Sequence, residues 1–353
     1  MIKVRPFSHF ITPVAAHTYT LQNAHSKLVL SDFGASIISL YVPDKNGLLK
    51  DVVLGFDFVD SYLDNPACFG NTIGPSANRT DKAELPIKNK IYHLQKNDGP
   101  ELQNNLHTDL VGGIHKRIWN TELNDEKNEV TFSLTLHDGE YGLPGNRTIK
   151  ATYKLVEDVQ QTTLFLTYSC TTDMQTFANF TNHTYFNLNG HSSGTVCNHK
   201  LLIHADNYLP LRPDCVSRGT IESVQGTPFD FTSLKHIGKD IQKENEQLAL
   251  AHGYDHCFTI QNFKENLIRP ALLATSESGR KLEISIDAPG AHFYTGNWLD
   301  EPRAKNDATY KAHSGFAFES EFYPDCAHHT EWPQPLCTPD HPYQSHIVYR
   351  FFS

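Results

Sequence analysis

The chain has 353 residues, of which 39% are hydrophobic and 20% charged, with 30 Lys and Arg against 40 Asp and Glu. A chain of this length buries enough surface to fold without disulfides or metals, and it fits one large all-β domain or two ordinary domains. The net charge of −10 argues against a nucleic-acid-binding protein, which needs a basic surface to replace phosphate counterions. The sequence has no run of about 20 apolar residues that would predict a transmembrane helix.

The cysteines indicate a reducing compartment. They are seven in number and none belongs to a Cys-x-x-Cys pair: Cys68, Cys170, Cys197, Cys215, Cys257, Cys326 and Cys337. Scattered cysteines in odd number are poor evidence for a disulfide framework or a zinc knuckle. Residues 1–10 lack the apolar stretch and the small-residue cleavage site of an export signal. We therefore expect a cytoplasmic protein.

The first half of the chain predicts short strands separated by turns. A single helical turn is expected at residues 61–64. Residues 130–136 alternate apolar side chains with Thr and Ser, which is typical of a strand with one buried face. Residues 163–170 alternate in the same way, and the aromatic-rich residues 181–188 also predict a strand. Turn signals such as Asp-Gly and Pro-Gly separate these segments.

The second half continues the pattern with a single helix. Strands are predicted at 195–205, 281–287 and 347–351, and a short surface helix at 239–252 begins near Asp240. Many short strands with almost no helix predict an all-β fold, a large antiparallel sandwich or barrel, rather than alternating strands and helices. Because no linker or internal repeat divides the sequence, we expect one domain spanning residues 1–353.

Familiar catalytic motifs offer little support. Residues 190–194, Gly-His-Ser-Ser-Gly, match the Gly-x-Ser-x-Gly nucleophile elbow, but a strand rather than a helix is predicted after them, so we expect a flexible loop. The 20 histidines include no His-Glu-x-x-His, and the adjacent His328 and His329 would point to opposite faces of a strand. There is no glycine-rich phosphate loop. The sequence predicts neither a metal site nor a nucleotide cofactor.

Two polar residues stand out within aromatic-rich, strand-like segments. His183 lies in Thr-Asn-His-Thr-Tyr-Phe-Asn-Leu at 181–188, although a histidine in a strand is more often a core residue. Glu319 lies in Gly-Phe-Ala-Phe-Glu-Ser-Glu-Phe at 315–322, where alternation puts Glu319 and Glu321 on one face and phenylalanines on the other. A carboxylate in such a segment is costly without donors, and a structural ion pair explains it as well as catalysis does.

A third set of residues indicates a function only in combination with the first two. It comprises Asn78, Arg79, His107, Asp255 and His256. Together with Glu319 and His183 these residues supply a carboxylate to take a proton, imidazoles to give or steer one, and an Arg and an Asp to bind hydroxyl groups. General acid–base catalysis needs such a division, with the acceptor and the donor on opposite sides of one reacting centre. Aromatic residues that could stack on a sugar ring are Tyr185, Phe186, Tyr294 and Trp298.

Short segments in order along the chain resemble one known family. They are Phe-Gly-Ala at 33–35, Val-Val-Leu-Gly-Phe at 52–56, Ile-Gly-Pro-Ser-Ala-Asn-Arg at 73–79, Asp-Gly-Glu-Tyr-Gly-Leu-Pro-Gly at 138–145, residues 181–188, Gly-Thr-Pro-Phe-Asp-Phe at 226–231, Asp-His at 255–256, Tyr-Thr-Gly-Asn at 294–297, and residues 319–325. Over residues 28–352 the chain is similar to the aldose 1-epimerase (galactose mutarotase) family. Single short motifs are weak, but this many in the correct order are specific.

The resemblance implies a fold, an activity and residue roles. The fold would be a large β-sandwich (supersandwich) of the galactose mutarotase type with very few short helices and a sugar cleft on one sheet. The activity would be an isomerase that interconverts α and β anomers of aldohexoses such as galactose and glucose, without metal, nucleotide or covalent intermediate. Glu319 would be the general base and His183 the general acid, with an unperturbed imidazole near ~6.5 suiting both halves of the reaction. Residues implied to bind the sugar are Asn78, Arg79, His107 and Asp255.

The chain departs from the family at two places near these residues. Thr108 and Asp109 follow His107 where the family commonly has Gly-Gly, so side chains occupy positions where backbone freedom is usual. Glu321 stands where Gln is usual, and a second carboxylate facing the same cleft could raise the pKa of Glu319.

Alternative functions remain open at this point. One is a non-catalytic sugar-binding β-sandwich, and another is an epimerase that prefers a reducing disaccharide such as maltose. An epimerase of hexose 6-phosphates would need cations near the cleft, for which Arg79 and Arg303 are candidates. A histidine-rich metalloenzyme is a further alternative. The expected partner is a small sugar, with no nucleic acid or membrane, and we expect a monomer or a weak homodimer.

Overall fold

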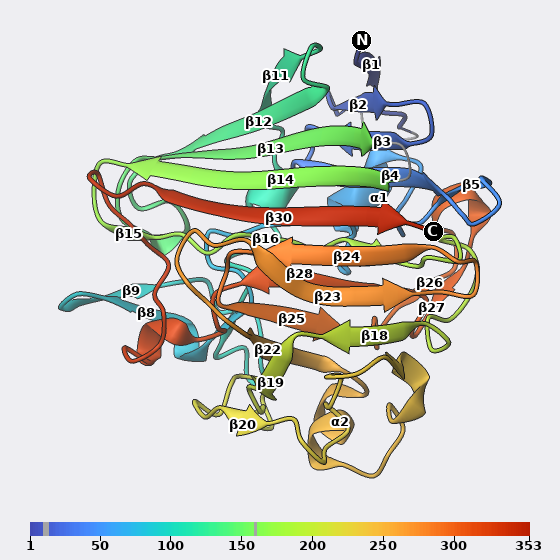
Figure 1. The fold of residues 1–353 in the computed structure, drawn as a ribbon. Coiled ribbons are helices and arrows are strands. Elements are labelled where there is room, and N and C mark those ends of the chain that lie inside the picture. The colour runs from blue at the N-terminus through green and yellow to red at the C-terminus, as the bar shows by residue number, and fades with distance from the viewer. Residues whose placement is uncertain (10–13, 159–160) are drawn as a thin grey trace.

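The computed structural model describes residues 1–9, 14–158 and 161–353, and antiparallel strands dominate them (Figure 1). The α-helices of this described part are short and are α1 (Val59–Asp64) and α2 (Glu246–Ala251). None of its helices is long and apolar enough to cross a membrane. The prediction of an all-β fold with very few short helices is confirmed.

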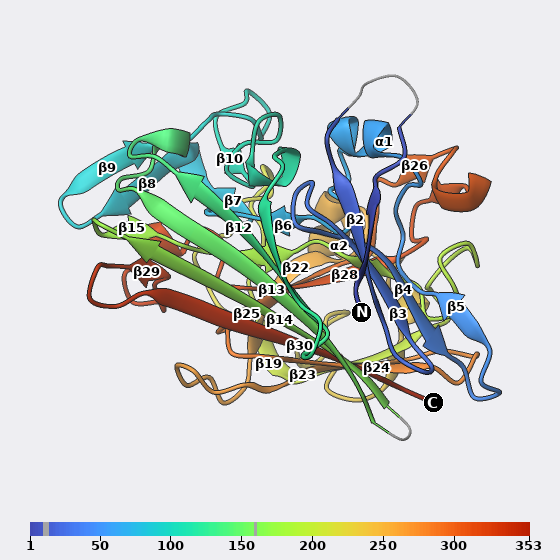
Figure 2. The same ribbon diagram turned by 90° about the horizontal axis from the view of Figure 1, so that it is seen from above.

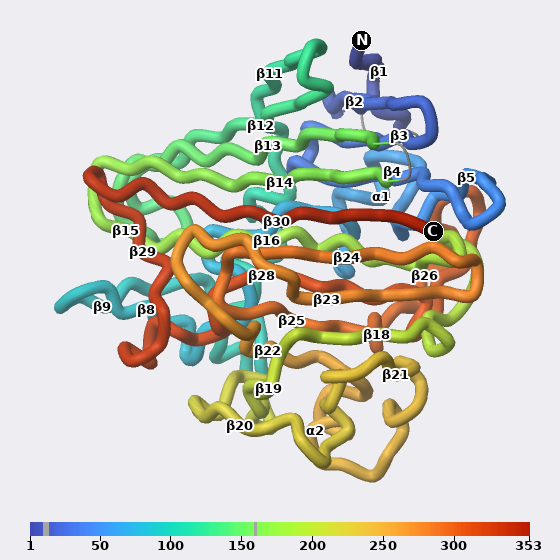
Figure 3. Tube along the Cα trace, viewed as in Figure 1, coloured from blue at the N-terminus to red at the C-terminus, as the bar shows by residue number. Residues whose placement is uncertain are grey.

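A long antiparallel sheet crosses the view in Figure 1. From edge to edge, its strands in the described residues are β11 (Asn120–Asn124), β12 (Glu129–Leu136), β13 (Arg147–Asp158), β14 (Gln161–Thr172), β30 (Tyr343–Phe352), β24 (Lys281–Ile286), β23 (Arg269–Thr275), β18 (Lys200–Ile203) and β21 (Lys235–His236). The C-terminal strand β30 therefore lies between β14 and β24, as the trace in Figure 3 shows. Along β12 buried side chains alternate with more exposed ones, so one face packs on the core.

A second antiparallel sheet packs behind the long one and carries the site described below (Figure 1). In strand order it consists of β17 (Tyr185–Phe186), β28 (Phe316–Glu321), β25 (Gly290–Tyr294), β22 (Asp255–Ile260), β19 (Ala205–Tyr208) and β20 (Glu222–Ser223). The ring of Phe186 in this sheet lies 5.5 Å from that of Tyr349 and 6.1 Å from that of Phe351, both in β30. These aromatic contacts join the two sheets into a sandwich.

The N-terminal part of the chain forms a third antiparallel sheet, seen from above in Figure 2. Its strands are β1 (Lys3–Pro6), β2 (His17–Gln22), β3 (Lys27–Ser31), β4 (Ser36–Pro43) and β5 (Leu49–Asp51). Short strand pairs complete the described residues: β6 (Thr72–Ile73) with β16 (Thr181–Asn182), β7 (Arg79–Thr80) with β10 (Asn105–Leu106), β8 (Glu84–Ile87) with β9 (Lys90–His93), β15 (Thr176–Phe177) with β29 (Leu336–Cys337), and β26 (Asp300–Glu301) with β27 (Tyr310–Lys311).

One buried apolar cluster contains side chains from all three sheets, among them Leu28, Phe132 and Phe293. Such a shared core is what a single domain requires. The domain boundary at residues 1–353 stays a prediction.

The helix predicted at 239–252 is shorter than expected. Helix α2 begins after Asn245, whose side-chain oxygen accepts hydrogen bonds from the backbone N–H groups of Gln247 and Leu248. Asp240 does not start the helix, because its carboxylate instead pairs with Lys235 at 3.0 Å and Lys243 at 2.8 Å. The helical turn expected at 61–64 is the last part of α1.

Two further local predictions need correction, and one is confirmed. Of residues 195–205, only Lys200–Ile203 form a strand before β19 begins at Ala205. His328 and His329 do not point to opposite faces of a strand, because they lie in and beside a short helical turn and both rings approach Asp325. Residues 190–194 form a turn, in agreement with the expected loop.

Candidate active site

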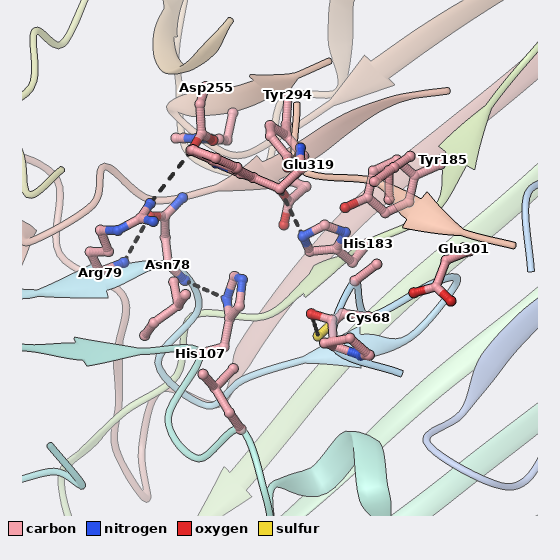
Figure 4. Close-up of a pocket in the computed structure, with 17 residues that line it drawn as sticks. Cys68, Asn78, Arg79, His107, His183, Tyr185, Asp255, Tyr294, Glu301 and Glu319 are labelled. Carbon is pink, nitrogen blue, oxygen red and sulfur yellow. Dashed lines mark hydrogen bonds and ion pairs between the residues drawn. The ribbon is translucent and has the colours of Figure 1, made fainter. Parts of the chain in front are cut away.

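A cavity of about 270 Å³ lies against the second sheet, close to the size of small-molecule sites, which begin near ~300 Å³ (Figure 4). Of the polar residues that the sequence analysis singled out, His256 does not line this cavity, because its ring packs against Phe229. The residues expected to act in catalysis or to bind the sugar line the cavity together, and they are Asn78, Arg79, His107, His183, Asp255 and Glu319. Because they come from widely separated parts of the chain, the fold and not local sequence assembles the site.

Strand register explains why the polar side chains of the second sheet converge. Across β28 and β25, Glu319 is directly opposite His292, and across β25 and β22, Tyr294 is opposite Asp255. Residues opposite one another in antiparallel strands share a face, so all four line the cavity. Phe318, one residue from Glu319, points into the core on the other face, as the alternation predicted.

His183 lies at an interruption between two strands. The predicted continuous strand at 181–188 is wrong in this detail, because β16 pairs with β6 while β17 pairs with β28, and His183 and Thr184 belong to neither. The chain thus changes sheets at His183. The backbone N–H of His183 donates to Asn71 at 2.9 Å, and its carbonyl accepts from Gly70 at 3.0 Å, which fixes the ring at the cavity wall.

His107 is held by the segment that carries Asn78 and Arg79. The backbone N–H of Asn78 donates to Nδ1 of His107 at 3.1 Å, and the N–H of His107 donates to the carbonyl of Asn78, also at 3.1 Å (Figure 4). Nε2 of His107 is thereby left as the ring nitrogen free to face the cavity. Burial and the neighbouring His183 lower the pKa of His107 well below its ordinary value, so the ring is neutral near pH 7.

The departure from Gly-Gly after His107 is accommodated by hydrogen bonds. Thr108 has a φ of 69°, a left-handed conformation that disfavours a β-branched residue. Its buried hydroxyl accepts from the N–H of Ser76 at 2.8 Å and donates to the carbonyl of Ser76 at 3.1 Å. These bonds tie the His107 loop to the segment before Asn78, so the loop keeps His107 at the cavity.

The carboxylate of Glu319 and the ring of His183 point toward one another (Figure 4). Oε1 of Glu319 lies 3.6 Å from Nε2 of His183, and only 2% of Glu319 is exposed. Within the described residues Oε2 of Glu319 and Nδ1 of His183 have no hydrogen-bond partner. Buried polar atoms without partners are rare and point to a functional site. The pair can pass protons to and from a bound molecule.

Burial disfavours the charged forms of both groups. It raises the pKa of Glu319 well above its ordinary value, with Asp255 adding to the effect and Arg79 opposing it. It lowers the pKa of His183 to about 4. The expectation of an unperturbed imidazole at His183 is therefore wrong. Burial therefore favours the neutral carboxyl group of Glu319 and the neutral imidazole of His183.

Arg79 and Asp255 form a charged pair at the other end of the cavity. Nε of Arg79 donates to Asp98 at 2.9 Å, and Nη1 lies 3.9 Å from Oδ2 of Asp255. Although burial alone raises the pKa of Asp255, the hydrogen bond from His292 and the charge of Arg79 outweigh it and lower the pKa to about 2. Asp255 is therefore ionised at neutral pH. Asp98, which the sequence analysis did not single out, orients Arg79.

His292 is a residue of this site that the sequence analysis missed. Its Nε2 lies 2.7 Å from Oδ1 of Asp255, and its Nδ1 lies 3.5 Å from Oε1 of Glu321. The sequence did contain a pattern that could have identified His292. Residues 290–294 resemble a strand, and alternation places His292 on the same face as Tyr294. The side chain of Asn78 also has a hydrogen-bond partner within the protein, because its Nδ2 donates to Oε1 of Glu321 at 3.0 Å.

The aromatic residues divide between cavity and core. Tyr185 and Tyr294 line the cavity, and their rings lie 5.1 Å and 6.4 Å from that of His183. Trp298 stands at the rim with 66% of its surface exposed. Phe186 does not face the cavity as proposed, because its side chain packs in the core between the sheets. Three of the four predicted aromatic residues can therefore contact a bound ring.

A metal ion could use some of the same side chains. The ligand-type atoms of His107, His183 and Glu319 all lie within 4.8 Å of one another. Two histidines and a carboxylate are ligands typical of zinc. A bound ion would occupy the atoms that could otherwise carry protons, so the two uses of these residues exclude each other.

An all-β sandwich whose cavity contains an acid–base pair and a charged pair defines an enzyme that moves protons on a small polar substrate. A family model described as aldose 1-epimerase matches residues 17–350. The chain is 35% identical to galactose mutarotase of Bos taurus over 343 residues, covering 96% of each protein, and 34% identical to aldose 1-epimerase of Escherichia coli strain K12, covering 94% of this chain and 93% of that protein. The chain belongs to the aldose 1-epimerase family.

A solved structure agrees with this membership. The crystal structure of an aldose epimerase homologue from C. elegans superposes with a TM-score of 0.85 at 32% identity and covers 96% of this chain and 99% of that one. The fold is therefore that of the galactose mutarotase type, as the resemblance implied. The protein is an isomerase that interconverts anomers.

Proposed function

We propose that this isomerase acts on aldohexoses, galactose and glucose in particular, with Glu319 as general base and His183 as general acid. Galactose is the sugar named for the bovine relative, and the E. coli relative carries the broader name aldose 1-epimerase. The observation that carries the proposal is the close approach of a buried carboxyl group and a buried imidazole at 3.6 Å in a cavity of sugar size.

The spacing of the pair suits the atoms that react. The anomeric hydroxyl oxygen O1 and the ring oxygen O5 are bonded to the same carbon, C1, so the groups that serve them must lie close together. At 3.6 Å the two side chains leave no room for a pyranose between them. Both therefore approach the C1 edge of the sugar, rather than opposite sides of the ring.

In the proposed mechanism one proton is taken and one is given. The proton of the neutral Glu319 carboxyl group first passes to His183. Glu319 then removes the proton from O1 while protonated His183 donates to O5, the C1–O5 bond breaks, and the sugar opens to the aldehyde. Rotation about C1–C2 presents the other carbonyl face. Glu319 then returns its proton to the aldehyde oxygen as a hydroxyl group attacks, and His183 recovers its proton from that hydroxyl. The total proton count of the pair is the same before and after turnover. Positioned acid–base groups of this kind typically contribute about 10²–10⁴-fold each.

Polarimetry on freshly dissolved α-galactose tests the activity and the sugar preference. We expect the purified protein to speed the approach to anomeric equilibrium for galactose and glucose, and to do so more effectively than for xylose and maltose.

The same assay after treatment with a chelator, with and without added zinc, tests the metal alternative at His107, His183 and Glu319. Loss of activity on chelation and recovery with zinc would contradict the proton-transfer assignment.

The pH dependence of kcat/KM follows from the pKa of His183. Below about pH 4 the Glu319–His183 pair gains a second proton, and Glu319 can no longer accept one. We therefore expect kcat/KM to stay constant from pH 7 down to about pH 5 and to fall to half near pH 4, where kcat/KM reports groups of the free enzyme. Circular dichroism at each pH checks that the fold persists. A half-loss near the ordinary histidine pKa of ~6.5 would contradict the buried pair.

Arg79 is proposed to hold sugar hydroxyls. Replacing Arg79 with Ala should raise KM about 10- to 100-fold, the effect of losing a hydrogen bond to a charged group, and should change kcat much less. Arg303, which is exposed and does not line the cavity, provides the matched control: Arg303→Ala should leave both constants unchanged. Unchanged kinetics for Arg79→Ala would rule out the binding role.

A preference for hexose 6-phosphates is not favoured. Among the described residues that line the cavity, Arg79 is the cation, and Asp98 and Asp255 already neutralise it. Glu301 and Glu319 add carboxyl groups to the same wall. A phosphate group would find no unpaired positive charge there.

The proposal also covers the setting of the protein. The described cysteines are all free thiols, which supports a reducing, cytoplasmic location. Light scattering on the purified protein tests the expected monomer or weak homodimer, and subcellular fractionation tests the location.

A further inference from the structure

The segment Asp-Gly-Glu-Tyr-Gly-Leu-Pro-Gly at 138–145 is a sequence motif that the proposed mechanism does not use. It connects β12 to β13 and includes a short helical turn at Glu140–Gly142. Within this turn Tyr141 has a φ of 58°, a left-handed conformation that residues other than glycine seldom adopt. Such backbone strain persists only where the surrounding structure imposes it, and it is concentrated at functional sites. A role for this motif should therefore lie in the contacts of Tyr141.

The turn that carries Tyr141 is fixed by the residues on either side of it. Before Tyr141, the carbonyl oxygen of Glu140 accepts a hydrogen bond from Nη2 of Arg147 at 2.9 Å. After Tyr141, Gly142 has a φ of 72°, and a Cβ atom placed on it would lie 1.9 Å from the carbonyl oxygen of His93. The backbone at residue 142 therefore packs too closely for any side chain, and the side chain of Tyr141 projects from a rigid base.

The hydroxyl group of Tyr141 contacts the loop at residues 108–113, which forms part of the cavity wall. The hydroxyl donates a hydrogen bond to the carbonyl oxygen of Gly112 at 2.8 Å. Near the other end of the loop, the hydroxyl of Thr108 accepts from the N–H of Ser76 and donates to the carbonyl of Ser76. The loop is therefore anchored at two points, and Tyr141 supplies the second one.

A turn between these two anchors orients Leu110. Oδ1 of Asp109 accepts hydrogen bonds from the backbone N–H groups of Val111 and Gly112 at 2.9 Å and 2.8 Å. Leu110 lines the cavity, whereas the next residue, Val111, does not line it and has 82% of its surface exposed. The turn thus directs one apolar side chain toward the cavity and its neighbour toward solvent.

We propose that Tyr141 is a positioning residue whose hydroxyl holds the carbonyl of Gly112 and thereby keeps Leu110 against the sugar bound in the cavity. Leu110 covers C–H groups of the pyranose, a contact that is favourable because it removes apolar surface from water. His107 is held separately by Asn78, so the Tyr141 anchor acts on Leu110. The contact of Leu110 with the sugar rests on the proposed function, whereas the anchoring of the loop does not.

Hydrogen exchange tests the anchor without reference to activity. Tyr141→Phe removes the hydroxyl and keeps the ring, so the backbone amides of residues 108–113 should exchange about 2- to 10-fold faster, the effect of one lost hydrogen bond. Tyr19→Phe is the matched control, because it removes a buried hydroxyl of β2 that donates to Asp32 at 3.1 Å, and it should leave exchange at 108–113 unchanged. Unchanged exchange in Tyr141→Phe, or an equal increase in both variants, overturns the proposal.

Kinetics on galactose test the contact between Leu110 and the sugar. Leu110→Ala should raise KM about 3- to 10-fold, the effect of burying part of one leucine side chain, with a smaller change in kcat. Tyr141→Phe should raise KM in wild type and should not raise it further in Leu110→Ala, because the anchor acts through that side chain. Val111→Ala, which shortens the neighbour that faces solvent, should leave both constants unchanged.

The outcomes separate this inference from the proposed function. Unchanged KM in Leu110→Ala, or an equal rise in Val111→Ala, overturns the contact with the sugar. If Tyr141→Phe does not fold, the comparison of Leu110→Ala with Val111→Ala decides. A wild-type protein without epimerase activity would refute the proposed function instead, and hydrogen exchange at residues 108–113 would still decide whether Tyr141 anchors the loop.

Discussion

Replacing Glu319 with Gln should lower kcat by about 10²–10⁴-fold while leaving fold and sugar binding intact. Glutamine keeps the size and the hydrogen-bonding shape of the side chain but cannot accept a proton from the anomeric hydroxyl. Only 2% of Glu319 is exposed, and the other residues around it can still hold the sugar. Polarimetry gives the rate, and calorimetric titration with galactose gives the affinity.

Glu301 offers a matched control for this substitution. It is the other glutamate that lines the described cavity, and it lies near the rim and is partly exposed. Glu301→Gln removes one carboxylate from the same cavity without touching His183, so its kcat should remain within a few-fold of wild type. Near wild-type turnover by Glu319→Gln, with the control behaving as expected, would remove Glu319 from the role of base.

The second large effect is expected at His183. His183→Asn removes the ring that donates to O5 and should also lower kcat by about 10²–10⁴-fold. The Glu319–His183 pair shares one proton, so the double variant should be scarcely slower than either single variant, because groups that act as a unit are not additive.

His346 provides a control for the loss of an imidazole as such. It lies in β30 away from the cavity and its ring contacts the hydroxyl of Thr167. His346→Asn should retain wild-type kcat. The double variant of Glu319→Gln and His183→Asn gives the outcome that would contradict this account. If the two reductions in kcat multiply in the double variant, the two residues serve separate steps, and the shared-proton mechanism is wrong.

Local sequence was sufficient to predict the fold class and several of the longer strands. Period-two alternation located β12, β14, β24 and β30, because each of these strands has one face on the core. Alternation also assigned Glu319 and Phe318 to opposite faces. It could not locate the interruption at His183, since that residue is where the chain passes from one sheet to another, and the choice of pairing partner is not encoded locally.

The site residues were predicted from motifs, whereas the predicted pKa of His183 was wrong. The resemblance brought Arg79, His107, Asp255 and Glu319 into one proposed site, and the structure brings them into one cavity. The low pKa of His183 depends on burial by the surrounding sheets, which no single segment reveals. His292 escaped notice because its importance comes from standing opposite Glu319 and beside Asp255, a matter of strand register.

The central claim is that one carboxyl group and one imidazole serve the two oxygens bonded to the same carbon atom. A crystal structure of Glu319→Gln with bound galactose tests it most directly. We predict O1 of the sugar within about 2.6–3.2 Å of the side chain at position 319, and O5 within the same distance of Nε2 of His183. A sugar bound in the cavity with C1 turned away from both residues, or bound elsewhere, would contradict the account.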